Sequence, residues 1–240
     1  MPSRQTMTAH EISKIIHGLA NPQNALHLQR FFKTGPGQYG EGDQFLGIRV
    51  PVLREQAKKF KDTPLADVQI LLTSAYHEER LCALLLLVQK FSRGSDAEKK
   101  SIYALYLRNT RYVNNWDLVD LSAYLIVGPY LADRDRRPLY ALARAASLWE
   151  RRIAIMSTFH FIKNNQFADT LAIAVLLLTD REDLMHKAVG WMLREIGKRD
   201  LAVEKEFLKS HYQRMPRTML RYAIEKFPEN ERQRYLKGLV

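Results

Sequence analysis

The sequence EERLCALLLL, residues 78–87, recurs in altered form as ERRIAIMSTF at residues 150–159. Both segments continue with apolar residues at the i, i+3, i+4 and i+7 spacing that indicates an amphipathic α-helix. The same pattern returns in MHKAVGWMLREI (185–196) and MPRTMLRYAIEKF (215–227), and NNWDLVDLSAYLI (114–126) fits the same register. A helical pattern that recurs about every 35 residues is typical of stacked helix pairs.

The repeat therefore predicts an all-α fold, an α-solenoid of HEAT-like helical repeats that is curved and has a basic concave face. One helix pair cannot bury its own apolar face, so neighbouring pairs must stack. We expect a single repeat domain over residues 1–240, with N-terminal helices at about 8–60 and repeats at about 61–240.

The composition limits the class of protein. The chain has 240 residues, a formal net charge of +11 and one cysteine, Cys82. Basic domains bind nucleic acid, anionic membrane surfaces or acidic proteins. The longest charge-free stretch, residues 121–132, is too short for a membrane span, and MPSRQTMTAH lacks the apolar region of a secretory signal. We predict a cytoplasmic monomer, nucleoid-associated if the source is prokaryotic, with no obligate protein partner.

Aligned repeats place charged residues at one recurring position. These are Arg80, Asp117, Arg152, Lys187 and Arg217. Because the second helices of such pairs usually line the concave surface, we expect a column that forms a cradle for a polyanion. The alternative is that the column is only the solvated edge of each helix.

Other motifs carry little functional weight. GPGQYG, residues 35–40, matches G-x-G-x-x-G but follows a helical segment rather than a strand, so we expect a glycine loop between helices. YHEER, residues 76–80, indicates a helix start with a favourable acidic first turn. The histidines are scattered, so the sequence predicts no metal site, and we expect no cofactor.

The segment WDLVD, residues 116–120, combines groups that suit a reaction. Trp116 and Asp120 share one helix face, with Asp117 turned partly away. Trp191 falls within one residue of Asp120 in the repeat register, and Arg152 lies in the repeat between them. We expect the four side chains to converge on the concave face, although tryptophan in a helical stripe is usually core and aspartate near a helix start is often a cap.

Together these groups suit cleavage of an N-glycosidic bond in DNA. Arginine binds phosphate, flat indole faces pack on sugar or base, and a carboxylate stabilises an oxocarbenium-like transition state. One carboxylate suffices when the leaving base is already cationic, because that base departs neutral without a general acid.

The chain resembles the AlkD-type DNA alkylation repair glycosylases, which are HEAT-like α-solenoids. The resemblance covers most of the chain and is most specific in FLGIRVPVLR (45–54), WDLVD (116–120), WERRIAI (149–155) and HKAVGWMLRE (186–195). It implies a monofunctional enzyme that excises cationic lesions such as 3-methyladenine and 7-methylguanine from duplex DNA without flipping the base into a pocket.

The resemblance also assigns roles to residues of this sequence. Asp120 would stabilise the sugar cation and position water, and Trp116 and Trp191 would pack on the lesion-bearing nucleotide. Arg152 would hold a phosphate. Charge and register alone add further candidates for phosphate contacts, which are Lys187, Arg194, Arg217 and Arg221.

Two features depart from the family pattern. Phe31 stands where characterised members have a tyrosine, so a hydroxyl contact with DNA is lost at this predicted DNA-binding position. The loop at residues 34–44 is longer than in those enzymes. Two alternatives therefore stay open: a non-catalytic protein that binds damaged or branched DNA, and a protein-interaction scaffold.

Overall fold

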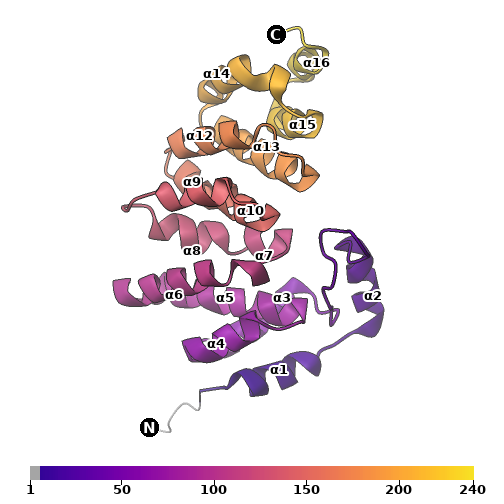
Figure 1. Ribbon diagram of the computed structural model, residues 1–240, viewed down its shortest axis with the longest axis vertical. Helices are drawn as coiled ribbons and strands as arrows, with labels where there is room; N and C mark the ends of the chain where they lie inside the picture. The colour runs from indigo at the N-terminus through magenta and orange to yellow at the C-terminus, as the bar shows by residue number, and fades with distance from the viewer. Residues whose placement is uncertain (1–5) are drawn as a thin grey trace. The chain divides into compact units, whose positions relative to one another are not determined.

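The computed structural model describes residues 6–240, which form α-helices and short 3-10 helices and contain no strand (Figure 1). An isolated parallel bridge joins Gln44 to Tyr76. The predicted all-α, α-solenoid-like fold is confirmed. Residues 1–5 lie outside the described part of the chain. The segment MPSRQTMTAH, in which the sequence predicts no secretory signal, begins with these residues.

The chain divides into two compact units, Met1–Ser122 and Ala123–Val240. The predicted single repeat domain over residues 1–240 remains a prediction. No helix between residues 6 and 240 is long and apolar enough to cross a membrane.

The first unit is built around one long helix, α5. In chain order its elements are α1 (Ala9–His17), α2 (Pro22–Phe31), α3 (Val50–Lys59), α4 (Leu65–Leu72), α5 (His77–Arg93), α6 (Asp96–Arg108), the 3-10 helix η1 (Thr110–Tyr112) and α7 (Trp116–Asp120). Helices α3, α4 and α6 all pack on α5 (Figure 1). This explains why residues 81–87 of α5 are apolar on nearly every side, since a helix covered by several neighbours has little polar face.

The second unit centres on α10 and α13. Its elements are α8 (Ala123–Tyr130), α9 (Arg137–Ala143), α10 (Leu148–Ser157), α11 (Phe159–Lys163), α12 (Ala168–Leu177), α13 (Asp183–Gly197), α14 (Leu201–His211), η2 (Tyr212–Arg214), α15 (Arg217–Ala223), η3 (Ile224–Lys226) and α16 (Glu229–Lys237). Helix α13 packs on α12, α14 and α15, and α10 packs on α8 and α9. Gly190 allows α15 to approach closely, because a Cβ there would meet the backbone oxygen of Met219 and lie 2.6 Å from Cβ of Tyr222.

The structure corrects the repeat register by one residue. Nη1 of Arg80 donates to the carbonyl oxygens of Ser74 and Ala75, at 2.9 and 3.1 Å. In the second unit it is Arg151, not Arg152, that does the same, with Nη1 donating to Ala145 and Ala146 at 3.1 and 2.6 Å.

Further along, His186 rather than Lys187 lies close to a carbonyl six residues earlier, with Nε2 2.6 Å from the oxygen of Asp180. The recurring basic residue therefore binds the turn that precedes its own helix. A sequence alignment cannot distinguish Arg151 from Arg152, because both are arginines at the start of the same helix.

Candidate functional site

Helix α7 presents two of the predicted site residues. Asn115 caps it, since its Oδ1 accepts the backbone N–H of Trp116 at 2.9 Å. Residues 117–119 face inward and are buried, whereas Trp116 and Asp120 are half-buried. The predicted helix at WDLVD is confirmed, and its indole and second carboxylate reach the accessible side.

Trp116 belongs to an aromatic group that also includes Phe31. Its ring stacks on Phe32, with ring centroids 5.3 Å apart and planes at 23°. Phe31, the last residue of α2, meets the indole edge-on at 6.0 Å and is 55% exposed. The structure thus places Phe31 beside Trp116, whereas the contact of Phe31 with DNA remains a prediction.

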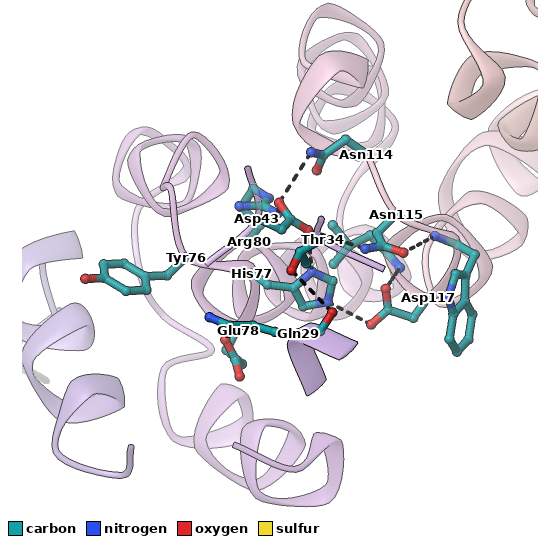
Figure 2. A network of polar contacts seen from close by, with 12 residues as sticks. Gln29, Thr34, Asp43, Tyr76, His77, Glu78, Arg80, Asn114, Asn115 and Asp117 are labelled. Atoms are coloured by element: carbon teal, nitrogen blue, oxygen red, sulfur yellow. Dashed lines mark hydrogen bonds and ion pairs between the residues drawn. The ribbon is translucent and has the colours of Figure 1, made fainter. Parts of the chain in front are cut away.

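A buried network of charged side chains connects the inward-facing side of α7 to α5 and to the 34–44 loop (Figure 2). We call it the buried network beneath α7. His77, the first residue of α5, lies between two carboxylates, with Nδ1 3.2 Å from Oδ2 of Asp43 and Nε2 2.9 Å from Oδ2 of Asp117. Arg80 Nη2 donates to Oδ1 of Asp43 at 2.5 Å, and the Asn115 amide donates to Oδ2 at 3.3 Å. The network joins the end of the 34–44 loop, the start of α5 and the start of α7.

The carboxylates determine the charge of His77. Burial by itself lowers the pKa of His77, but the negative charges and hydrogen bonds of Asp117 and Asp43 outweigh it and raise the pKa to about 9. Burial raises the pKa of Asp43, and the hydrogen bond from His77 and the charge of Arg80 more than reverse this, so the pKa lies below its usual value. At neutral pH the network contains two carboxylates, an imidazolium and a guanidinium.

The two glutamates in the first turn of α5 also bind other segments of the first unit. The carboxylate of Glu78, 1% exposed, accepts the backbone N–H groups of Leu46, Gly47 and Ile48 at 2.9, 2.7 and 3.1 Å. Glu79 accepts a hydrogen bond from Ser74 and lies 3.3 Å from Nε2 of His17. The predicted helix start at residues 76–80 is confirmed, and both carboxylates also hold other parts of the first unit.

The predicted column of surface charges is wrong at three of its five positions. Arg80, Asp117 and Arg152 are only 3%, 7% and 4% exposed. None of the three is a solvated surface position, and Arg80 and Asp117 are not part of a cradle for a polyanion, because buried charges need partners within the protein. Arg80 and Asp117 find those partners in Asp43 and His77.

Within the second unit the predicted phosphate-binding residues lie in varied environments. Nη1 of Arg152 donates to the carbonyl of Leu184 in α13 at 2.6 Å. Lys187 pairs with Asp183 at 2.7 Å, Arg194 pairs with Glu225, and Arg217 donates to the carbonyl of Leu236. Arg221 is exposed. Their contacts with DNA, and the convergence of Arg152 and Trp191 with Trp116 and Asp120, remain predictions.

Trp191 lies in an aromatic group bordered by cations. Its ring centroid is 6.3 Å from that of Phe159, and Phe159 in turn is 5.4 Å from Tyr124. Lys163 Nζ lies 4.5 Å from the Phe159 ring centroid and 4.7 Å from that of Tyr124. We call Tyr124, Phe159 and Trp191, together with the cations Lys163, Lys198 and Arg199, the Trp191 cluster.

Glu195 orients one edge of this cluster. Its carboxylate accepts the indole N–H of Trp191 at 3.2 Å and pairs with Lys198 at 2.5 Å and Arg199 at 3.3 Å. Aromatic faces beside partly exposed cations can contact bases, sugars and phosphates at once.

The comparisons with known proteins agree with this architecture. Residues 12–227 match the family model described as DNA alkylation repair enzyme. The chain belongs to this family. A solved structure from Enterococcus faecalis, described as a "predicted DNA alkylation repair enzyme", has the same fold, with a TM-score of 0.68, 19% identity, and coverage of 88% of this chain and 97% of that chain. No curated protein matches the chain significantly.

Sequence reasoning missed several residues of this family member's site region. It interpreted residues 76–79 only as part of a helix start, and it did not single out Asp43, Asn115, Lys163 or Glu195. A signal existed in the two adjacent glutamates after His77, which is an unusual density of titratable groups before a wholly apolar run. Within residues 6–240 no group of three or more His, Cys, Asp or Glu side chains is arranged to hold a metal ion.

Proposed function

We propose that this protein is a monofunctional DNA glycosylase that excises positively charged alkylated purines, such as 3-methyladenine and 7-methylguanine, from duplex DNA. The observation that carries the proposal is α7, which leaves Trp116 and Asp120 half-buried while the intervening residues are buried. Membership of the DNA alkylation repair enzyme family supports the same substrate class.

The proposed chemistry needs one carboxylate. The bond between C1′ and the base nitrogen breaks, its electron pair leaves with the alkylated base, and the base departs neutral because it began as a cation. The sugar becomes oxocarbenium-like, and the negative charge of Asp120 stabilises it. A water molecule positioned by the same carboxylate then attacks C1′ and gives up a proton to it. The lesion stays outside any base-binding pocket during this step.

The two units supply different contacts in this proposal. Trp116 and Phe31 in the first unit pack on the deoxyribose beside the lesion, and Trp191 in the second unit packs on the DNA backbone. Phosphates are held by Lys163, Lys198 and Arg199 of the Trp191 cluster, together with the predicted residues Arg152, Lys187, Arg194, Arg217 and Arg221. Several exposed cations are consistent with the net charge of +11.

Single-turnover release of 7-methylguanine from duplex DNA tests the proposal. Asp120→Asn keeps the shape but removes the charge, so release should fall by about 100-fold or more, the effect of losing one preorganised electrostatic contact. Asp133→Asn, at an exposed position after α8, is the matched control and should release base at the wild-type rate. Equal release by Asp120→Asn and wild type would refute the role of Asp120.

No release by wild type, with salt-sensitive duplex binding retained, would favour a non-catalytic DNA-binding protein. No release together with duplex binding that salt does not weaken would favour a protein-interaction scaffold.

A further inference from the structure

The buried network beneath α7 assigns a role to a residue that touches no DNA. We propose that His77 is a positioning residue: held as an imidazolium between Asp43 and Asp117, it sets the orientation of α7 and therefore of Trp116 and Asp120. Its kinetic consequence rests on the proposed glycosylase function, whereas its structural consequence does not.

The geometry requires both ring nitrogens of His77 to carry protons. Each nitrogen faces a carboxylate oxygen, at 3.2 Å on the Asp43 side and 2.9 Å on the Asp117 side. A carboxylate can only accept, so a neutral imidazole would leave one nitrogen lone pair against a carboxylate oxygen. His77 is 2% exposed, and no bulk water relieves such a contact.

Helix α7 depends on these anchors because it is short. Five residues form little more than one turn, and a single turn is not stable on its own. Its N-terminus is held by the Asn115 cap and by Asp117, whose other oxygen accepts the backbone N–H of Leu118 at 2.9 Å. Its C-terminal side is held by Ser122, which donates to the carbonyl of Leu118 at 2.6 Å. Movement of Asp117 would therefore turn the whole helix.

A second connection runs through aromatic rings. The His77 ring stacks on Phe45, with ring centroids 4.6 Å apart and planes at 22°, and lies 5.1 Å from Phe32. Phe32 in turn stacks on Trp116. Aromatic faces favour a cation, so the charge of His77 also stabilises the rings on which the indole rests.

Few other charged groups surround His77. Arg80, one turn along α5, faces Asp43, and its charge favours the ionised carboxylate. Glu78 faces the amides of residues 46–48, and Glu79 faces Ser74 and His17 of α1. Asp43 and Asp117 are thus the groups in direct contact with the imidazole, and loss of its proton would leave Asp117 facing a neutral ring.

Fluorine NMR tests the structural consequence without relying on catalysis. The full chain contains three tryptophans, Trp116, Trp149 and Trp191, so labelling with 5-fluorotryptophan gives three resonances that single Trp→Phe variants assign. As pH rises from 7 to 10.5, the Trp116 resonance should shift with a midpoint near the His77 pKa of about 9. A Trp116 resonance that stays still across this range in wild type would overturn the proposal.

Two variants make the test specific. His77→Gln should abolish the titration of the Trp116 resonance, whereas Glu79→Gln, which removes a buried charge from the same helix, should retain it. If His77→Gln does not fold, the wild-type titration still decides. A titration of equal size in His77→Gln would overturn the proposal, because another group would then be responsible.

Single-turnover excision measures the kinetic consequence. At pH 7, His77→Gln should release 7-methylguanine about 10-fold to 100-fold more slowly than wild type, the effect of misplacing a reacting group by about 1 Å. Its dissociation constant for duplex DNA should change by less than about threefold, because the proposed phosphate contacts lie on other residues. Dividing the wild-type rate of base release by the His77→Gln rate cancels the pH dependence that belongs to the substrate. This ratio should approach one near pH 10, because His77 has then lost its proton in wild type.

The outcomes separate the two proposals. Release at equal rates by wild type and His77→Gln at pH 7 would overturn the positioning role and leave the glycosylase intact. A titrating Trp116 resonance without release by wild type would support the positioning of Trp116 and refute the proposed function.

Discussion

The Trp191 cluster makes a quantitative prediction about how salt weakens DNA binding. We consider the triple substitution Lys163→Gln, Lys198→Gln and Arg199→Gln. Each phosphate that a cation neutralises contributes about 0.9 to the slope of log K against log salt. Glu195 pairs with two of the three cations, so it offsets about one of their charges. The slope should therefore become shallower by about 1.8 to 2.7.

Between about 50 and 200 mM salt, this difference in slope corresponds to a factor of about 12 to 40 in affinity. The triple variant should thus lose much less of its affinity over that range than wild type loses. Fluorescence anisotropy of a labelled duplex at several salt concentrations measures both slopes. Far-ultraviolet circular dichroism of the same samples checks that the variant is folded.

A matched control uses cations of the first unit. Lys61, Lys90 and Arg93 line a cavity at the C-terminal end of α5, a helix of 17 residues that has His77 at its other end. Their replacement by Gln removes the same charge and should leave the slope within about 0.5 of the wild-type value. Equal slopes for wild type and the Trp191-cluster variant, or equal losses in the two triple variants, would refute a specific DNA contact at this cluster.

Two predictions concern stability. Glu78→Gln leaves an amide N–H₂ facing a backbone N–H, so it should lower the free energy of unfolding by about 2–4 kcal/mol, measured by urea denaturation; a loss below about 1 kcal/mol would show that the 46–48 amides do not depend on this carboxylate. Glu204, 1% exposed on α14, has its pKa raised by burial to about 8 despite the nearby charges of Arg194 and Lys205. Because the pKa is raised, the neutral carboxyl of Glu204 stabilises the folded protein below about pH 4.5, and this stabilisation is lost as the pH rises through about 8. At pH 9 the Glu204→Gln variant should therefore melt at a higher temperature than wild type. The difference between the two melting temperatures should shrink by pH 6. Identical melting temperatures at pH 9 would contradict this account of Glu204.

Local pattern was enough to predict most helices. Apolar spacing in residues 78–91 and 183–198 depends only on neighbours one turn away, and both segments are helical in the structure. The helix at Trp116 was predicted for the same reason. A loop rather than a strand was predicted around GPGQYG because a helical segment precedes it, and the structure has a loop there. The motifs FLGIRVPVLR (45–54), WDLVD (116–120), WERRIAI (149–155) and HKAVGWMLRE (186–195) resembled the family that the comparisons then identified.

The same local pattern misplaced the charged column. Arg80, Asp117 and Arg152 recur at intervals of 37 and 35 residues, which suggests a common surface, but repetition does not reveal whether a position is covered. Burial depends on what the neighbouring element presents. Arg80 is buried because Asp43, from a loop far earlier in the chain, lies within 2.5 Å of its guanidinium. Helical periodicity carries no information about a partner that distant.

The sequence by itself determined that this protein is built from amphipathic helices, because each helix follows from contacts between residues three and four positions apart. It also determined which chemistry the chain has available at Trp116 and Asp120. Only the tertiary structure decided how that short helix is held, since His77 lies between Asp43 and Asp117, and the two carboxylates come from different segments. Five residues cannot fix their own orientation, so the packing of distant segments beneath α7 fixes where its indole and carboxylate point.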